Sequence, residues 1–106
     1  ENPRTETLRD LGKITIPSMG AFMVHKLIVA SRRRDEGKKA KDYRQAHSVA
    51  KTVLRDNNEL NKTGQIIKGL HKKRQKMMLK SSKEASKYVP GADEVFQEVW
   101  RALGLD

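Results

Sequence analysis

The segment from Met19 to about Arg33 constrains the fold most, because its apolar residues surround the helical wheel completely. Ser18 precedes it and is a residue type suited to cap a helix start. A helix that is apolar on every side has to be buried, or to lie between two partners. Other elements of the chain, or another domain or subunit, therefore have to cover this helix. The apolar positions are Met19, Phe22, Met23, Val24, Leu27, Ile28, Val29 and Ala30.

Three further stretches repeat apolar residues at helical spacing and can supply those elements. The first runs from about Lys38 to Asp56, and the second, in one or two helices, from about Glu59 to Lys87. Gly69 falls inside the second stretch, where a glycine costs about 1 kcal/mol relative to alanine and favours a break. The third stretch is a terminal helix within residues 91–104. The sequence thus predicts an all-α fold, a small bundle of four or five helices.

Short polar or extended segments separate these helices. Lys13 to Ile16 alternates polar and β-branched residues and stops at Pro17, which predicts a short N-terminal strand or an extended arm. Gly37 is available for a left-handed stop after the first helix. The pair Asn57-Asn58 breaks the helical pattern and can cap the helix that follows it. We expect a single helical domain over residues 1–106, a C-terminal fragment of a longer protein. Residues 1–17 form the arm, 18–87 a basic helical core and 91–104 the terminal helix.

Composition excludes several classes of site. The 106 residues include no cysteine, so disulfides, thiolate metal sites and thiol nucleophiles are absent. His25, His47 and His71 are scattered without the spacing of a zinc site, and we expect no metal ligand in this chain. No apolar run approaches the roughly 20 residues that a membrane span needs. The chain also starts at Glu1 without a secretory leader pattern, so we expect a cytoplasmic protein that does not contact a membrane.

Lys26 is the residue that the helical pattern singles out. Its neighbours on the wheel are apolar, so its ammonium group either reaches solvent along its own stem or is desolvated and paired. A pairing partner could be a carboxylate, or a phosphate held by another domain. Asp42 is the best carboxylate within the chain, because it lies at the edge of the apolar stripe of the next helix.

Positive charge is concentrated in the middle of the chain. The formal net charge is +10, and residues 38–87 alone hold 15 basic and 4 acidic side chains. Lysines in the second half of this segment share one helical face, which suits a nucleic-acid backbone. The same face could be merely solvated, since it lacks interleaved aromatic residues for base stacking. These lysines are Lys62, Lys72, Lys73, Lys76, Lys80, Lys83 and Lys87.

Catalytic motifs are missing from the sequence. It contains no glycine-rich phosphate loop, no His-Glu-x-x-His and no Gly-x-Ser-x-Gly. It also contains no Asp-x-Asp pair of the kind that binds two metal ions. We therefore predict no catalytic residue in this chain.

Residues 12–55 nevertheless resemble part of a known family. A strand ending at Pro17 leads into a Phe-x-x-His-Lys-Leu helix at Phe22–Leu27, with Arg32-Arg33 after it. A Lys-x-x-Lys-Asp-x-x-Gln-Ala helix follows at residues 38–46. This pattern is similar to the helical C-terminal region of bacterial nucleotidyltransferase-fold proteins of the polymerase-β-like superfamily. Their catalytic domain carries a Gly-Ser motif and an Asp-x-Asp pair, and both are absent here.

The resemblance implies an accessory helical domain with no activity alone, which supports a nucleotide site on a missing N-terminal catalytic domain. Lys26, Lys41 and Asp42 are then the nucleotide-proximal positions, and the parent protein would use Mg²⁺ and a nucleoside triphosphate. Two alternatives stay open. The chain could be a stand-alone module that binds nucleic acid through its Lys62–Lys87 face, or a structural piece that pairs with a homodimer partner.

Overall fold

The computed structural model describes residues 18–105, and within them every regular element is helical. The first three helices are α2 (Met19–Arg32), α3 (Glu36–Arg55) and α4 (Asn57–Lys68). They are followed by α5 (Lys72–Glu84), the short 3-10 helix η1 (Ala85–Lys87) and α6 (Ala92–Ala102). The prediction of an all-α bundle is confirmed. The predicted strand or arm within residues 1–17 lies outside the described residues.

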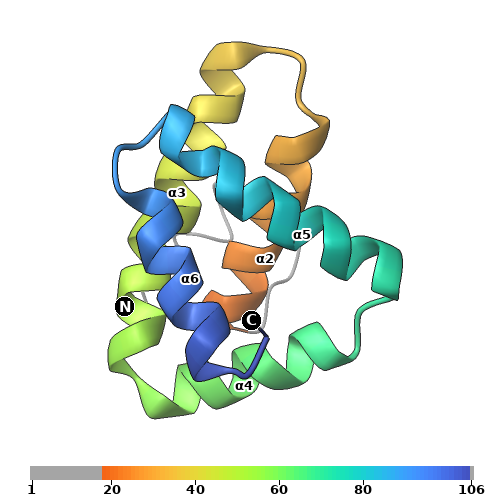
Figure 1. Cartoon of the computed structure of the whole chain (residues 1–106), viewed down its shortest axis with the longest axis vertical. Coiled ribbons are helices and arrows are strands. Elements are labelled where there is room, and N and C mark those ends of the chain that lie inside the picture. Colours follow the sequence, from red (N-terminus) through yellow and green to blue (C-terminus); the bar gives the residue numbers. More distant parts are fainter. Residues whose placement is uncertain (1–17, 106) are drawn as a thin grey trace.

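Helix α2 occupies the centre of the bundle, as its all-round apolar wheel predicts. It packs against α3, α4 and α5, while α6 covers α3 and α5 on another side. Figure 1 shows α2 surrounded in this way, with α4 and α5 diverging from the turn that joins them. Met23 and Leu27 at the middle of α2 are fully buried. The long helix α3 makes the most extensive contact with α2, and this contact carries the candidate site.

The buried hydroxyl groups on the inner face of α5 are hydrogen-bonded. The Tyr43 hydroxyl of α3 lies 2.9 Å from the Ser81 hydroxyl of α5, which in turn donates to the Leu27 carbonyl oxygen of α2 at 2.6 Å. The indole nitrogen of Trp100 donates to the Ser82 hydroxyl at 3.0 Å. Because each of these buried hydroxyls has a partner, the hydrogen bonds offset the cost of removing the hydroxyls from water.

A glycine sets the distance between α2 and α4. A side-chain carbon added at Gly20 would overlap Thr63 and lie 2.7 Å from its Cβ atom. Thr63 is itself fully buried and donates its hydroxyl to the Glu59 carbonyl oxygen at 2.6 Å. Only a glycine therefore allows the two helices to approach this closely.

Two expected helix boundaries are wrong. The structure also decides whether the stretch from Glu59 to Lys87 forms one helix or two. Gly37 does not stop the first helix, since it lies inside α3 and its φ is not positive. Helix α2 ends earlier, at Arg32, and α3 begins after Asp35, whose side chain accepts from the Lys38 amide at 3.0 Å. Asp56, not Asn57, caps α4. The stretch from Glu59 to Lys87 forms two helices, which separate at residues 69–71.

Candidate functional site

Lys26 is buried in the contact between α2 and α3. The residue is 7% exposed, and its Nζ donates to Oδ1 of Asp42 at 3.2 Å. The same Nζ lies 5.5 Å from the centre of the Phe22 ring, where the π electrons attract a cation. The alternative in which the side chain reaches solvent is wrong. Of the alternatives that the sequence leaves open, the structure has the pairing of Lys26 with Asp42.

Arg33 completes the arrangement, and sequence reasoning did not assign it to the site. Its Nε donates to Oδ2 of Asp42 at 2.9 Å, so a single carboxylate that is 2% exposed bonds two cations. Arg33 is the first residue after α2 and has an extended backbone, which turns the chain back towards α3. We call Lys26, Arg33 and Asp42 the Asp42 cluster. Its formal charge is +1, and the half-exposed Arg33 guanidinium is its outer member.

Lys41 does not join the Asp42 cluster. Consecutive residues of a helix point about 100° apart, so Lys41 faces away when Asp42 faces α2. The Lys41 side chain is exposed, and it has no ion pair within residues 18–105. The structure therefore brings together two of the three predicted positions and leaves the third at the surface beside them.

Two other polar groups accompany the cluster. Burial, with the nearby Lys26 charge as a second cause, lowers the pKa of His25, which precedes Lys26 on α2. Gln45, one turn after Asp42, has a buried Oε1 atom without a hydrogen-bond partner among the described residues. Gln45 belongs to the motif on which the family resemblance rests. Sequence reasoning considered His25 and did not assign it to a site, and it gave Gln45 no role beyond the motif.

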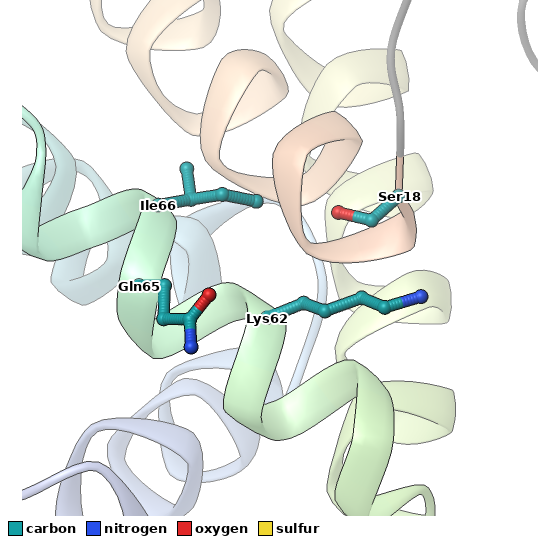
Figure 2. A pocket seen from close by; sticks show the side chains of 4 residues that line it. All are labelled: Ser18, Lys62, Gln65 and Ile66. Carbon is teal, nitrogen blue, oxygen red and sulfur yellow. The ribbon is translucent and has the colours of Figure 1, made fainter.

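The N-terminal end of α2 is hydrogen-bonded to a carboxylate of α4. Oε1 of Glu59, a buried residue, accepts from the Met19 amide at 3.1 Å, and Lys62 lies 3.8 Å from the other oxygen. A cavity of about 440 Å³ opens here, lined among the described residues by Ser18, Lys62, Gln65 and Ile66. Figure 2 shows Ile66 pointing towards α2 and Lys62 extending past Ser18. This cavity is separate from the Asp42 cluster in its lining residues.

A groove of about 230 Å³ lies between α2, α4 and α5. Its floor is apolar, and His25, Arg32 and Arg74 contribute polar groups to its lining. His25 and Arg32 directly precede Lys26 and Arg33 of the Asp42 cluster in the sequence, and Arg32 and Arg74 supply the positive charge of the groove.

The predicted lysine face is divided between two helices. Lys62 belongs to α4, whereas Lys72 opens α5 and Lys87 ends η1. An unbroken line from Lys62 to Lys87 is therefore not formed, because the chain changes direction between α4 and α5. The six remaining lysines are all exposed: Lys72, Lys73, Lys76, Lys80, Lys83 and Lys87.

Within residues 18–105, no group of three or more histidine, aspartate or glutamate side chains is placed to hold a metal ion. In the same range no helix has the length and apolar character needed to cross a membrane.

Comparison with known proteins adds one match. The chain fits the profile of a family described as nucleotidyltransferase over residues 5–67. This region contains α2, α3 and nearly all of α4, and therefore the whole Asp42 cluster. Neither the curated proteins nor the solved structures include a significant match. Because the matched region spans more than half of the chain, the protein belongs to the nucleotidyltransferase family.

Proposed function

We propose that this chain is an accessory helical region of a nucleotidyltransferase and supports a nucleotide site whose catalytic groups lie on another segment. The family match supports the general activity. The sequence itself has no Gly-Ser motif and no Asp-x-Asp pair, so transfer chemistry has to come from elsewhere. Acting alone, the chain would catalyse no transfer.

The Asp42 cluster is the observation that carries this proposal. Asp42 uses both carboxylate oxygens on Lys26 and Arg33, which fixes the Arg33 side chain through its Nε atom. The terminal nitrogens of that guanidinium have no partner within residues 18–105 and belong to a side chain that is 36% exposed. An arginine held in this manner is preorganised to donate two hydrogen bonds to a phosphate.

The roles divide by exposure. Arg33 and the exposed Lys41 would contact the triphosphate, where their charge offsets that of the phosphates. Lys26 and Asp42 are positioning residues, since both are buried in the helix contact and engaged with each other. This revises the simpler expectation that Lys26 itself approaches the phosphates.

The Mg²⁺ that such a reaction uses does not fit the described residues. Asp42 already bonds two cations, and no acidic cluster is available for a metal. A divalent ion prefers several free oxygen ligands. The metal would therefore be bound by the catalytic segment, and this chain would supply cationic side chains only.

The test uses the full-length protein that the gene encodes. Its reading frame should contain a Gly-Ser motif followed by Asp-x-Asp. Nucleotide transfer by the purified protein should then be measured for the wild type and for Arg33→Gln. Loss of one charge-assisted contact to phosphate should raise KM for the nucleotide about 10-fold.

The neighbouring variant Arg34→Gln is the matched control, because Arg34 is exposed and takes no part in the cluster. It should leave KM within about twofold of the wild-type value. A reading frame without the catalytic motifs, or an unchanged KM in Arg33→Gln, would contradict the proposal.

A further inference from the structure

One face of α5 concentrates positive charge without compensation. Residues 72–87 include seven basic side chains and a single acidic one, Glu84. At about 100° per residue, the five lysines of α5 fall within an arc of about 100° on the helical wheel, and Lys87 follows in η1. The buried residues of α5 and η1 occupy the opposite arc. We call these six residues the lysine ridge: Lys72, Lys73, Lys76, Lys80, Lys83 and Lys87.

Among the described residues, Glu84 is the one acidic side chain within residues 72–87, and it forms no ion pair with the lysine ridge. No ion pair within residues 18–105 involves any of the six lysines, and all six are exposed. Solvated helices commonly intersperse glutamates at a spacing of three or four residues, which gives attractive pairs. Here the ridge lysines repel one another at that same spacing. An unneutralised row of this kind favours a polyanionic partner.

The dimensions of the ridge suit a double helix. At 1.5 Å per residue, the 13 residues of α5 extend about 20 Å. Each strand of a duplex advances about 3.4 Å per phosphate, so the ridge spans about six base pairs. Lys72, Lys76 and Lys80 stand about 6 Å apart along the helix, which is close to the spacing of every second phosphate on one strand.

The chemistry of the ridge favours backbone contact over base contact. Lysine binds phosphate as a point charge and carries no fixed hydrogen-bond pattern. No aromatic residue lies in α5, whereas single-strand binding relies on stacking of bases on aromatic rings. Recognition would therefore depend on the duplex backbone and not on sequence.

A lipid surface is the less favourable partner. Helices that bind bilayers insert an apolar face beneath the headgroups. The apolar and small residues of α5 instead pack inside the bundle, with Met78, Ser81 and Ser82 buried against other helices. No apolar side of α5 is left to enter a membrane.

We propose that the lysine ridge binds the phosphate backbone of double-stranded nucleic acid, without sequence preference. This site is distinct from the Asp42 cluster and does not depend on the nucleotidyltransferase role. About four lysines in simultaneous contact would give a slope of about −3.6 in a plot of log affinity against log salt.

The experiment measures fluorescence anisotropy of labelled 20-base-pair RNA and DNA duplexes of mixed sequence. Titrations of the chain at 50 and 200 mM NaCl should show a fall in affinity of ~150-fold. Comparison of the RNA and DNA titrations identifies which duplex binds more tightly. A 20-nucleotide single strand and phosphatidylserine vesicles serve as competing probes, and both should bind more weakly than the preferred duplex.

Two variants that carry the same net charge distinguish an effect of the ridge lysines from an effect of the overall charge of the protein. In the first, Lys72, Lys76, Lys80 and Lys83 are changed to glutamine. In the second, four exposed cations of α3 are changed to glutamine: Lys38, Arg44, Lys51 and Arg55.

The ridge variant should lose binding at 50 mM NaCl and most of its salt dependence, because each phosphate contact contributes about one unit of slope. The α3 variant should keep its duplex affinity within a few-fold. Replacing the same ridge lysines by arginine should preserve binding, and circular dichroism confirms that each variant is folded. Equal losses in the two glutamine variants, tighter binding to single strands or vesicles, or no duplex binding at 50 mM NaCl would overturn the proposal.

Discussion

Lysine appears in two opposite settings in this protein. Lys26 is buried in α2, and Asp42, 16 residues away in the sequence, neutralises it. The ridge lysines of α5 lie in solvent with no partner in the described part of the chain. A buried cation needs a fixed carboxylate and therefore contributes to specifying the fold. An exposed one makes no such demand, so its charge is available for an external partner.

The largest expected effect comes from removing the buried carboxylate. Asp42→Asn leaves Lys26 buried beside Arg33 without a counter-charge, which should lower the free energy of unfolding by about 3 kcal/mol. Lys26→Met should cost less, because Asp42 keeps its bond to Arg33 and the methionine fills similar space. Urea unfolding followed through the fluorescence of the buried Trp100 measures both. A change below about 0.5 kcal/mol for Asp42→Asn would show that the pair does not constrain the fold.

A second variant tests whether the close packing of α2 against α4 stabilises the fold independently of the Asp42 cluster. Gly20→Ala forces a side-chain carbon into Thr63, and we expect a loss of about 2 kcal/mol in the same urea assay. Gly64→Ala on α4 is the matched control. Its new carbon would meet only the flexible end of Leu103 at 3.2 Å, so stability should be unchanged or higher by up to about 1 kcal/mol. Similar results for the two variants would refute the close α2–α4 contact.

Neutralising the ridge lysines should leave the stability of the fold almost unchanged, unlike removal of the carboxylate that pairs with Lys26. With Lys72, Lys76, Lys80 and Lys83 changed to glutamine, the free energy of unfolding should stay within about 0.5 kcal/mol of wild type. Added salt should stabilise the wild type by screening the repulsion among these lysines, and the variant should gain less. Unfolding in 20 and 500 mM NaCl checks this. A large loss of stability in the variant would mean that the ridge is structural.

The smallest expected effect is a dependence on pH. Burial lowers the pKa values of His25 and His47 below the ordinary value of 6.5, so the folded state binds protons less readily than the unfolded state. Stability due to these groups is therefore present above about pH 6.5 and decreases as the pH falls below it. His25→Gln should make the unfolding midpoint less sensitive between pH 7.5 and 5.5. An unchanged pH profile would exclude His25 as a contributor.

Helical periodicity was sufficient to predict the bundle and to single out Lys26 among apolar neighbours, because both follow from which residues share a helical face. It left open whether the Lys26 side chain is buried or reaches solvent. It also identified Asp42, since that carboxylate lies at the edge of an apolar stripe. Arg33 was missed because its contribution depends on the extended turn after α2, which no periodic pattern encodes. The run Arg32-Arg33-Arg34 beside a buried helix was the available signal. Glu59 was missed for a similar reason, since it caps α2 from a helix distant in the sequence.

The lysine face was predicted only in part. A wheel assumes one continuous helix, and the break at residues 69–71 removes Lys62 from the line while leaving the α5 residues aligned. Lys41 shows a limit of prediction from a family motif. The motif matches at this position, yet the Lys41 side chain faces away from the neighbouring site residue Asp42. The nucleotide-proximal role of these residues stays a prediction.

The central claim is that Asp42 holds both Lys26 and Arg33 at the junction of α2 and α3. Nitrogen–proton NMR spectra of the labelled chain observe the Arg33 Nε–H group directly. The wild type should give a well-resolved, slowly exchanging Nε–H signal that is lost in Asp42→Asn and retained in Lys26→Met. A signal that exchanges as quickly as those of the solvent-exposed arginines in the wild type would contradict the claim.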